Sequence, residues 1–301
     1  LLTLEQDRLD MPAGFAVAPM GTVWAKGSLD SLRESSHSAL HAEVQVAETH
    51  LGSLLDWFEI EDVGGVLYLQ GTVSGTVASP HIEAEATVFE PCYRQYQLDA
   101  LNADLTSDLR ELHVTQLLAN RGSAAIAASG SLTGLEKIRE PRSYTDIQIA
   151  GSFDGAGIRL AEMGDMLGRK FDSLDGLAEL QGVFGGTLDD PIATGQVKIA
   201  HAMTTTLDIT EGFIPFELAG RIIEVEDALF HVQGSELYAQ ASIDLRYEPT
   251  MTASLSAADI YLEGIYQLQE MGLDIGGLVQ MPVAKVSGPF DNLSGQALLL
   301  S

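Results

Sequence analysis

The amino-acid sequence predicts an all-β protein: an elongated, repetitive, mostly antiparallel sheet that curls along its length, with a few short helices. Three observations lead to this prediction. A glycine-containing turn motif recurs along the chain, short runs of alternating apolar and polar residues follow each copy, and Gly is abundant, with 30 residues in 301. Such patterns are typical of proteins built from repeated strand–turn–strand units.

The turn motif occurs three times. The first two copies are Gly71–Pro80 and Gly182–Pro191, and the third, Val286–Gly295, carries Leu293 in place of the proline. The central glycines of consecutive copies are 111 and 102 residues apart. This spacing predicts a structural unit of about 100 residues that repeats along the chain.

Ahead of each motif the sequence predicts a strand followed by a short helix. Two strands are expected at 15–18 and 22–29, and a third at 43–47. Apolar residues then recur at the i, i+3, i+4 and i+7 spacing of one helical face. In the three units these residues are Leu51, Leu54, Leu55 and Phe58; Leu160, Met163, Met166 and Leu167; and Leu262, Ile265 and Tyr266.

Behind each motif, turn residues separate short strands, as in an antiparallel meander. After Pro80, strands are expected at 82–88, 96–105, 111–118 and 124–131, and after Pro191 at 195–199, 205–210, 213–219, 222–226, 228–232 and 236–245.

The repeats divide the chain into four segments. Residues 1–40 are expected to end a preceding repeat, 41–140 and 141–250 to form two full units, and 251–301 to begin a third. The charged, proline-containing stretch 139–143 separates the two full units. We expect one continuous elongated sheet, cut from the interior of a larger chain, and not separate globular domains.

Alternation along the strands predicts a sheet with one apolar face and one acidic face, because successive side chains point to opposite sides. The apolar face must be covered, either by a second sheet in a sandwich or by curling of the sheet into an apolar trough. Glycines at fixed places favour curling. The residues predicted to line the trough are Ile82, Ala84, Ala86, Val88, Leu112, Val114, Ile126, Val197, Ile199, Leu237, Ala239, Ala241, Ile243 and Leu245.

Composition excludes several functions. The chain has 43 Asp and Glu but only 16 Lys and Arg, a formal net charge of −27, which is unsuited to binding nucleic acid or an anionic membrane surface. The single cysteine, Cys92, forms no disulfide framework. The sequence shows neither a signal peptide nor an apolar run as long as a membrane-spanning helix.

Residues suited to catalysis or metal binding are sparse. His37 and His41 have i, i+4 spacing but lack the glutamate of a zinc-peptidase helix, and Asp189 and Asp190 are typical of a turn before Pro191. The sequence therefore predicts no enzyme, no cofactor and no metal.

The repeat resembles the TamB family, within the AsmA-like group of bacterial envelope proteins. The resemblance rests on Gly71–Pro80 with Ile82 and Ala84 behind it, on the later stretch 127–132, and on the second copy at Gly182–Pro191. It implies a long curled sheet with an apolar interior that crosses the periplasm from an anchor in the inner membrane. It also implies phospholipid acyl chains as cargo and an Omp85-type outer-membrane barrel as a partner of other parts of the chain.

Two functions follow from these observations as expectations. The first is bridge-like transport of phospholipids along the apolar trough between the inner and outer membranes, in support of outer-membrane assembly. The alternative is a structural or adhesive β-repeat protein of the cell surface with a filled core and no lipid cargo.

Overall fold

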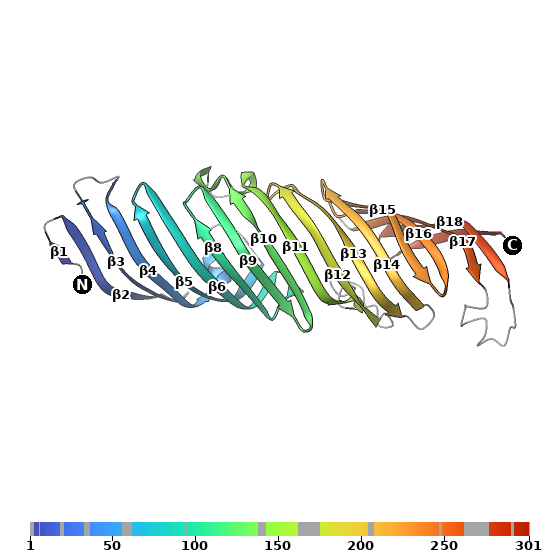
Figure 1. The fold of residues 1–301 in the computed structure, drawn as a ribbon, viewed down its shortest axis with the longest axis horizontal. Helices are drawn as coiled ribbons and strands as arrows, with labels where there is room; N and C mark the ends of the chain where they lie inside the picture. The colour runs from blue at the N-terminus through green and yellow to red at the C-terminus, as the bar shows by residue number, and fades with distance from the viewer. Residues whose placement is uncertain are drawn as a thin grey trace. The chain divides into compact units, whose positions relative to one another are not determined.

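A computed structural model gives the fold (Figure 1). It describes residues 3–5, 7–18, 21–32, 37–55, 62–93, 96–137, 143–161, 175–203, 208–246, 249–261, 277–289 and 292–300. Within these ranges the chain forms 19 strands of one antiparallel sheet that is not closed, together with one short α-helix and two described 3-10 turns. The prediction of an all-β, antiparallel, repetitive sheet is confirmed.

The chain divides into two compact units. Unit 1 comprises Leu1–Ser152 with Thr187–Asp189, and unit 2 comprises Phe153–Gly186 with Asp190–Ser301. Strand β11 (Gln148–Arg159) contributes its first part to unit 1 and its second part to unit 2.

Unit 1 is a meander in which each strand pairs antiparallel with the next, except that β6 pairs with both β7 and β8. Strands β2 to β6 and β8 to β10 lie side by side in Figure 1. Its strands are β1 (Thr3–Glu5), β2 (Arg8–Ala18), β3 (Gly21–Asp30), β4 (Ala39–His50), β5 (Val63–Thr76), β6 (Ser79–Tyr93), β7 (Tyr96–Gln97), β8 (Ala100–Ser107), β9 (Glu111–Arg121) and β10 (Ala124–Thr133).

Helix α1 (Leu51–Leu55) follows β4 and contacts β4 and β5. It lies behind the strands in the view of Figure 1. The helix predicted from Leu51, Leu54 and Leu55 is therefore confirmed over these residues, while Phe58 lies outside the described residues. The 3-10 turns η3 (Leu135–Lys137) and η4 (Ser143–Asp146) precede β11.

Unit 2 repeats the antiparallel meander. They are β12 (Asp175–Gly186), β13 (Pro191–Met203), β14 (Asp208–Ala219), β15 (Ile222–Val232), β16 (Ser235–Asp244), β17 (Thr250–Tyr261), β18 (Leu278–Pro289) and β19 (Ser294–Leu300). The predicted helix residues Met163, Met166, Leu167, Leu262, Ile265 and Tyr266 lie outside the described residues.

Two predictions of separate strands in unit 2 are wrong. Residues 213–219 do not form a strand apart from the one before them, because β14 runs from Asp208 to Ala219 without a break. Likewise 222–226 and 228–232 form the single strand β15, with a register shift between Val225 and Ala228. Asp227, whose φ is 53°, forms a β-bulge at this point. The strand continues through the bulge, although the alternation of apolar and polar residues shifts there.

The central glycine of each copy of the turn motif has a positive φ angle. Gly75, Gly186 and Gly288 have φ angles of 95°, 88° and 133°. A Cβ atom at each would lie 2.6 to 2.7 Å from a backbone carbonyl oxygen, that of Ser79, Asp190 and Asn292 respectively. Only glycine tolerates both the left-handed backbone and this close approach, so the third copy keeps the geometry although its proline is lost.

Candidate functional site

The strand register of unit 1 joins apolar side chains into rows that cross successive strands. Ala84 pairs with Gly71 and Leu105, and Leu105 pairs with Val114. From β2 to β10 the row is Gly14, Ala25, Val44, Gly71, Ala84, Leu105, Val114 and Gly130. Two predicted lining residues, Ala84 and Val114, therefore share one row of the same face.

Parallel rows place the other predicted residues of unit 1 on that face. Ala86 pairs with Leu69 and Ala103. The remaining rows are Val73, Ile82, Ser107, Leu112 and Leu132, and Leu67, Val88, Leu101, Ala119 and Ile126. Ile82 and Leu112 thus share one row, two strands apart, and Val88 and Ile126 share another, three strands apart.

Unit 2 has an apolar face of the same construction. Ile199 and Leu237 belong to one row through Gly212 and Phe230. Ala239, Ala241 and Ile243 pair with Leu255, Ala253 and Met251 of β17, and Val197 pairs with Leu180 and Ile214. Leu245 lies after the end of β16, is 37% exposed and donates its backbone N–H to the carbonyl oxygen of Arg221, at 2.9 Å.

Most of these side chains are half-buried. Among the predicted lining residues only Val88 and Ile199 are buried, each 6% exposed. The buried hydrophobic residues of the described ranges are Val88, Ala103, Ile147, Leu160, Ala178, Ile199, Ala202, Ala228 and Ala257. Since all described strands belong to one sheet, no second sheet among them packs on the apolar face, and much of that face keeps contact with solvent.

One part of the apolar face of unit 2 is packed by its own side chains. Leu160, which follows β11, forms a buried cluster with Ala178, Ile199 and Ala202. Ile158, Val197, Ile209, Ile214 and Phe230 pack against this cluster. Leu160 was predicted to be a helix residue, and this is confirmed: it has helical backbone directly after the end of β11, and its side chain covers the face locally.

Phenylalanine rings on this face were not among the predicted residues. Phe153 and Phe184 stack with ring centroids 6.4 Å apart. Phe216 pairs with Gly195, and Phe230 pairs with Gly212. The alternation within each strand could have identified Phe184 and Phe216, but sequence alone could not place a ring over the glycine of a neighbouring strand.

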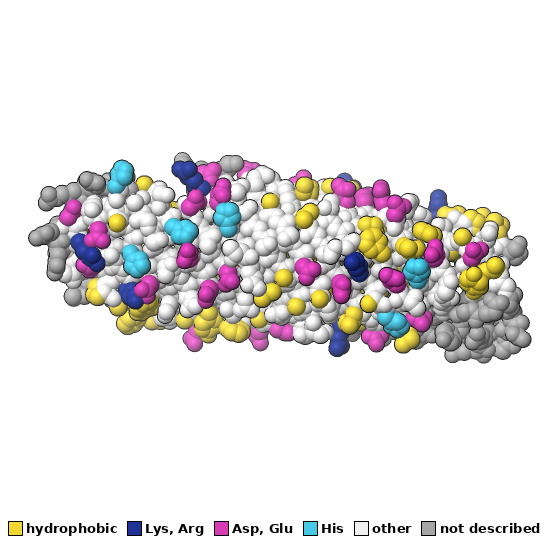
Figure 2. All heavy atoms as spheres, in the orientation of Figure 1, with side chains coloured by type: hydrophobic (Ala, Val, Ile, Leu, Met, Phe, Trp, Pro, Cys, Tyr) yellow, Lys and Arg dark blue, Asp and Glu magenta, His cyan; other side chains and the backbone are white. Residues whose placement is uncertain are grey.

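The opposite face carries the charged side chains (Figure 2). Acidic residues are spread over it, and the few basic residues that lie there include Lys26, whose Nζ lies 2.6 Å from a carboxylate oxygen of Glu43. Glu83 and Glu85 alternate with Ala84 and Ala86 along β6, with the acidic residues exposed and the alanines half-buried. The predicted separation of an apolar and an acidic face is therefore present in β6, one of the strands whose alternation led to the prediction.

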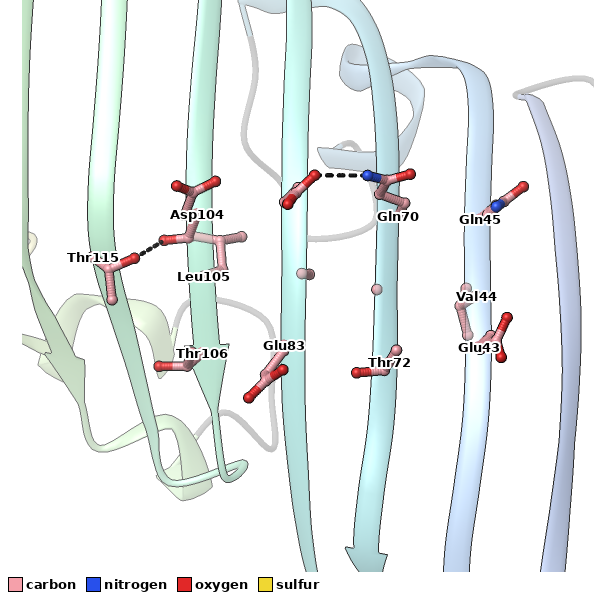
Figure 3. A pocket seen from close by; sticks show the side chains of 13 residues that line it. Glu43, Val44, Gln45, Gln70, Thr72, Glu83, Asp104, Leu105, Thr106 and Thr115 are labelled. Carbon is pink, nitrogen blue, oxygen red and sulfur yellow. Dashed lines mark hydrogen bonds between the residues drawn. The ribbon is translucent and has the colours of Figure 1, made fainter.

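A hollow of about 470 Å³ lies on the acidic face of unit 1 (Figure 3). Gln70 donates a hydrogen bond of 2.6 Å to Glu85, and the Thr115 hydroxyl donates one of 3.2 Å to the backbone carbonyl of Asp104. Glu43, Glu83 and Thr72 are among the other polar residues that line it. The two hydrogen bonds each join neighbouring strands, while Glu43 pairs with Lys26 and Glu83 contacts His81.

The structure does not support the helical histidine pair considered from the sequence. His41 lies in strand β4, so the i, i+4 relation to His37 does not place the two rings on one helical face. Within the described ranges no cluster of three or more His, Cys, Asp or Glu residues could hold a metal ion.

Comparisons with protein-family models, with curated proteins and with solved structures gave no match. None of the helices in the described part of the chain is long and apolar enough to cross a membrane. Inferences about function therefore rest on the geometry of the apolar and acidic faces of the sheet.

Proposed function

We propose that the apolar face binds phospholipid acyl chains and that the protein carries lipids, without catalysis, between the inner and outer membranes of a bacterial envelope. The observation that carries the proposal is the set of apolar rows, such as Val44–Gly71–Ala84–Leu105–Val114, that cross successive strands and remain partly exposed. The resemblance of the repeat to the TamB and AsmA-like proteins supports the same function.

Such a face suits acyl chains energetically. Each methylene group removed from water contributes about 0.8 kcal/mol. A lipid tail that slides across rows of Ala, Val, Leu and Gly exchanges one apolar contact for a similar one, so barriers to movement stay low. Because the described apolar rows carry no basic side chain, binding should depend little on the lipid headgroup.

The proposal places the protein in the periplasm, where an aqueous gap separates the two membranes. The acidic face, with Glu83 and Glu85 on β6, would keep the sheet in water while the opposite face holds the lipid tails. An Omp85-type barrel is proposed as a partner of other parts of the full protein.

Two measurements test the proposal. Organic extracts of the purified protein should contain phospholipid by mass spectrometry, and the protein should accelerate transfer of a fluorescent phospholipid between two vesicle populations. Replacement of Ala84 by Arg, which places a cation on the apolar face above Gly71, should abolish both. Thr72→Arg, on the exposed face of the neighbouring strand, is the matched control and should change neither.

The results also separate the proposal from the adhesive or structural alternative. A protein that is folded by circular dichroism, free of lipid and inactive in transfer would overturn the proposal and favour the alternative. If Ala84→Arg unfolds the protein, Ala84→Phe serves instead, since it preserves the apolar character while it obstructs the row.

A further inference from the structure

The acidic face of unit 2 contains an apolar patch formed by Phe213, Leu229 and Tyr238. The register places the three side chains in one row across β14, β15 and β16, on the side opposite the apolar rows. Phe213 is 37% exposed and Tyr238 is 46% exposed, and Leu229 between them is half-buried. Figure 2 shows hydrophobic side chains gathered over these strands with acidic side chains and a basic one at their border, and Lys198 of β13 pairs with Phe213.

A hollow adjoins this patch. The β14–β15 ladder is interrupted between Phe213 and Glu217, and the β15–β16 ladder between Val225 and Ala228. Pro215, which has no N–H for the ladder, lies in the first interruption, two residues from Phe213 on the same face. The resulting hollow measures about 490 Å³, within the range of pockets that hold small ligands, about 300–1,000 Å³.

The wall of the hollow is negatively charged. Glu217 pairs directly with Glu224 on the neighbouring strand, and Glu226 also lines the hollow. Within the described part of the chain none of the three forms an ion pair, and Glu224 accepts one hydrogen bond of 2.7 Å from Ser242. Like charges directly opposite each other destabilise a sheet, so a cation in the hollow would remove an existing repulsion.

We propose that the patch and the hollow together dock a basic, amphipathic segment of a partner protein. An aromatic or aliphatic side chain of that segment packs on Phe213, Leu229 and Tyr238, and a Lys or Arg two or more residues away enters the hollow between Glu217, Glu224 and Glu226. Aromatic contacts at the centre with charged groups at the rim are the usual arrangement of protein interfaces. The occupant is a protein segment and not a membrane surface, because the surrounding face carries an excess of carboxylates.

The test uses the full 301-residue chain and two synthetic peptides, one alternating Lys with Leu and Trp, the other alternating Lys with Gly and Ser. Fluorescence anisotropy at physiological salt should show the first peptide binding at least tenfold more tightly than the second. Phe213→Thr combined with Tyr238→Thr should remove that difference, and Glu217→Gln combined with Glu226→Gln should weaken binding of both peptides about threefold to tenfold.

Matched controls distinguish a defined surface from general attraction to an acidic protein. Leu278→Thr with Leu298→Thr removes two other exposed apolar side chains of unit 2, on β18 and β19, and Glu83→Gln with Asp104→Asn removes two charges from unit 1. Both controls should bind like the parent. If they weaken binding as much as the patch variants do, or if both peptides bind equally well to the parent, the proposal is wrong.

A second copy of the chain is the competing occupant, and sedimentation velocity tests it. The proposal requires the parent to show the same oligomeric state as Phe213→Thr with Tyr238→Thr. A shift of the parent alone to a larger species, lost in this double variant, would assign the patch to self-association and overturn the proposal.

Discussion

The ring of Phe216 lies directly over Gly195, its partner on the neighbouring strand: a Cβ atom at Gly195 would lie 2.9 Å from Cζ of Phe216. Phe230 lies over Gly212 in the same way, with Cδ1 3.1 Å from the corresponding position, and Phe153 lies over Gly182 at 2.5 Å. Each glycine lacks the side chain that would collide with the ring, and each ring covers the backbone that the missing side chain leaves exposed. On the apolar face of unit 2, glycine and phenylalanine are therefore a single packing element.

Replacement of Gly195 by Ala should destabilise unit 2, because the added methyl group collides with the Phe216 ring and with the backbone of β12. The expected loss in the free energy of unfolding is about 1–3 kcal/mol, as for other overpacked sites. Urea denaturation followed by circular dichroism measures it. Gly14→Ala is the control, since a methyl group there would lie 3.6 Å from Sδ of Met11, an ordinary contact. Equal stability of the two variants would contradict the proposed role of the glycine.

The repeated turn makes a separate prediction. Gly75→Ala and Gly186→Ala should each lower the free energy of unfolding by about 1–3 kcal/mol, because Ala must adopt a left-handed conformation against the carbonyl oxygen of Ser79 or Asp190. Thermal denaturation of both variants is the measurement. Similar losses at the two sites are expected from their similar geometry, and Ser74→Ala should be close to neutral. A loss at only one site would show that the copies are not equivalent.

Leu160 anchors the buried cluster of unit 2, so Leu160→Ala should cost about 2–3 kcal/mol through lost burial and the cavity that remains. The effect should be visible as faster amide hydrogen exchange in β12 and β13, which contribute Ala178, Ile199 and Ala202. Leu177→Ala, at a site 51% exposed in the same unit, should change stability by less than about 0.5 kcal/mol. If Leu160→Ala also behaves this way, the cluster contributes little to stability.

Ala84→Phe tests the apolar face without introducing a charge. Ala84 lies between Gly71 and Leu105, and the missing side chain of Gly71 leaves room beside it. We expect the variant to remain folded and to transfer fluorescent phospholipid at least tenfold more slowly than the parent. Lipid transfer at the parental rate, with bound lipid still present, would place the acyl chains elsewhere.

The stability that the Asp244 carboxyl contributes should depend on pH, because Arg246 forms hydrogen bonds with it. Hydrogen bonds from the Arg246 side chain, and then from its backbone N–H, lower the pKa of Asp244 to about 2. The Arg246 Nε lies 2.9 Å from Oδ1 of Asp244. Because the folded-state pKa is below the unfolded value, about 3.9, the stabilisation is present above pH 4 and is lost as the pH falls through 2.

Carbon-detected NMR of the Asp244 carboxyl should therefore show a midpoint near pH 2. In Arg246→Met the midpoint should rise towards the ordinary value, and the variant should lose less stability than the parent between pH 4 and pH 2. An unchanged midpoint in Arg246→Met would contradict this account.

Sequence by itself determined the strand content, the turn motif and the two-faced character of the sheet. Period-two alternation in 82–88 and 236–245 is enough to assign strands, because side chains in an extended chain must point to opposite sides. The recurrence of Gly75, Gly186 and Gly288 could also be predicted from local sequence, because a backbone position with positive φ favours glycine wherever it occurs.

Only the tertiary structure decided which residues of different strands meet. Register is a long-range property, so Ala84 could not be aligned with Val114, nor Phe216 with Gly195, until strand pairing was known. Bulges such as the one at Asp227 shift the phase of alternation, which is why β15 was expected as two strands. The same interruptions formed the hollow beside Phe213, a surface that no single stretch of sequence contains.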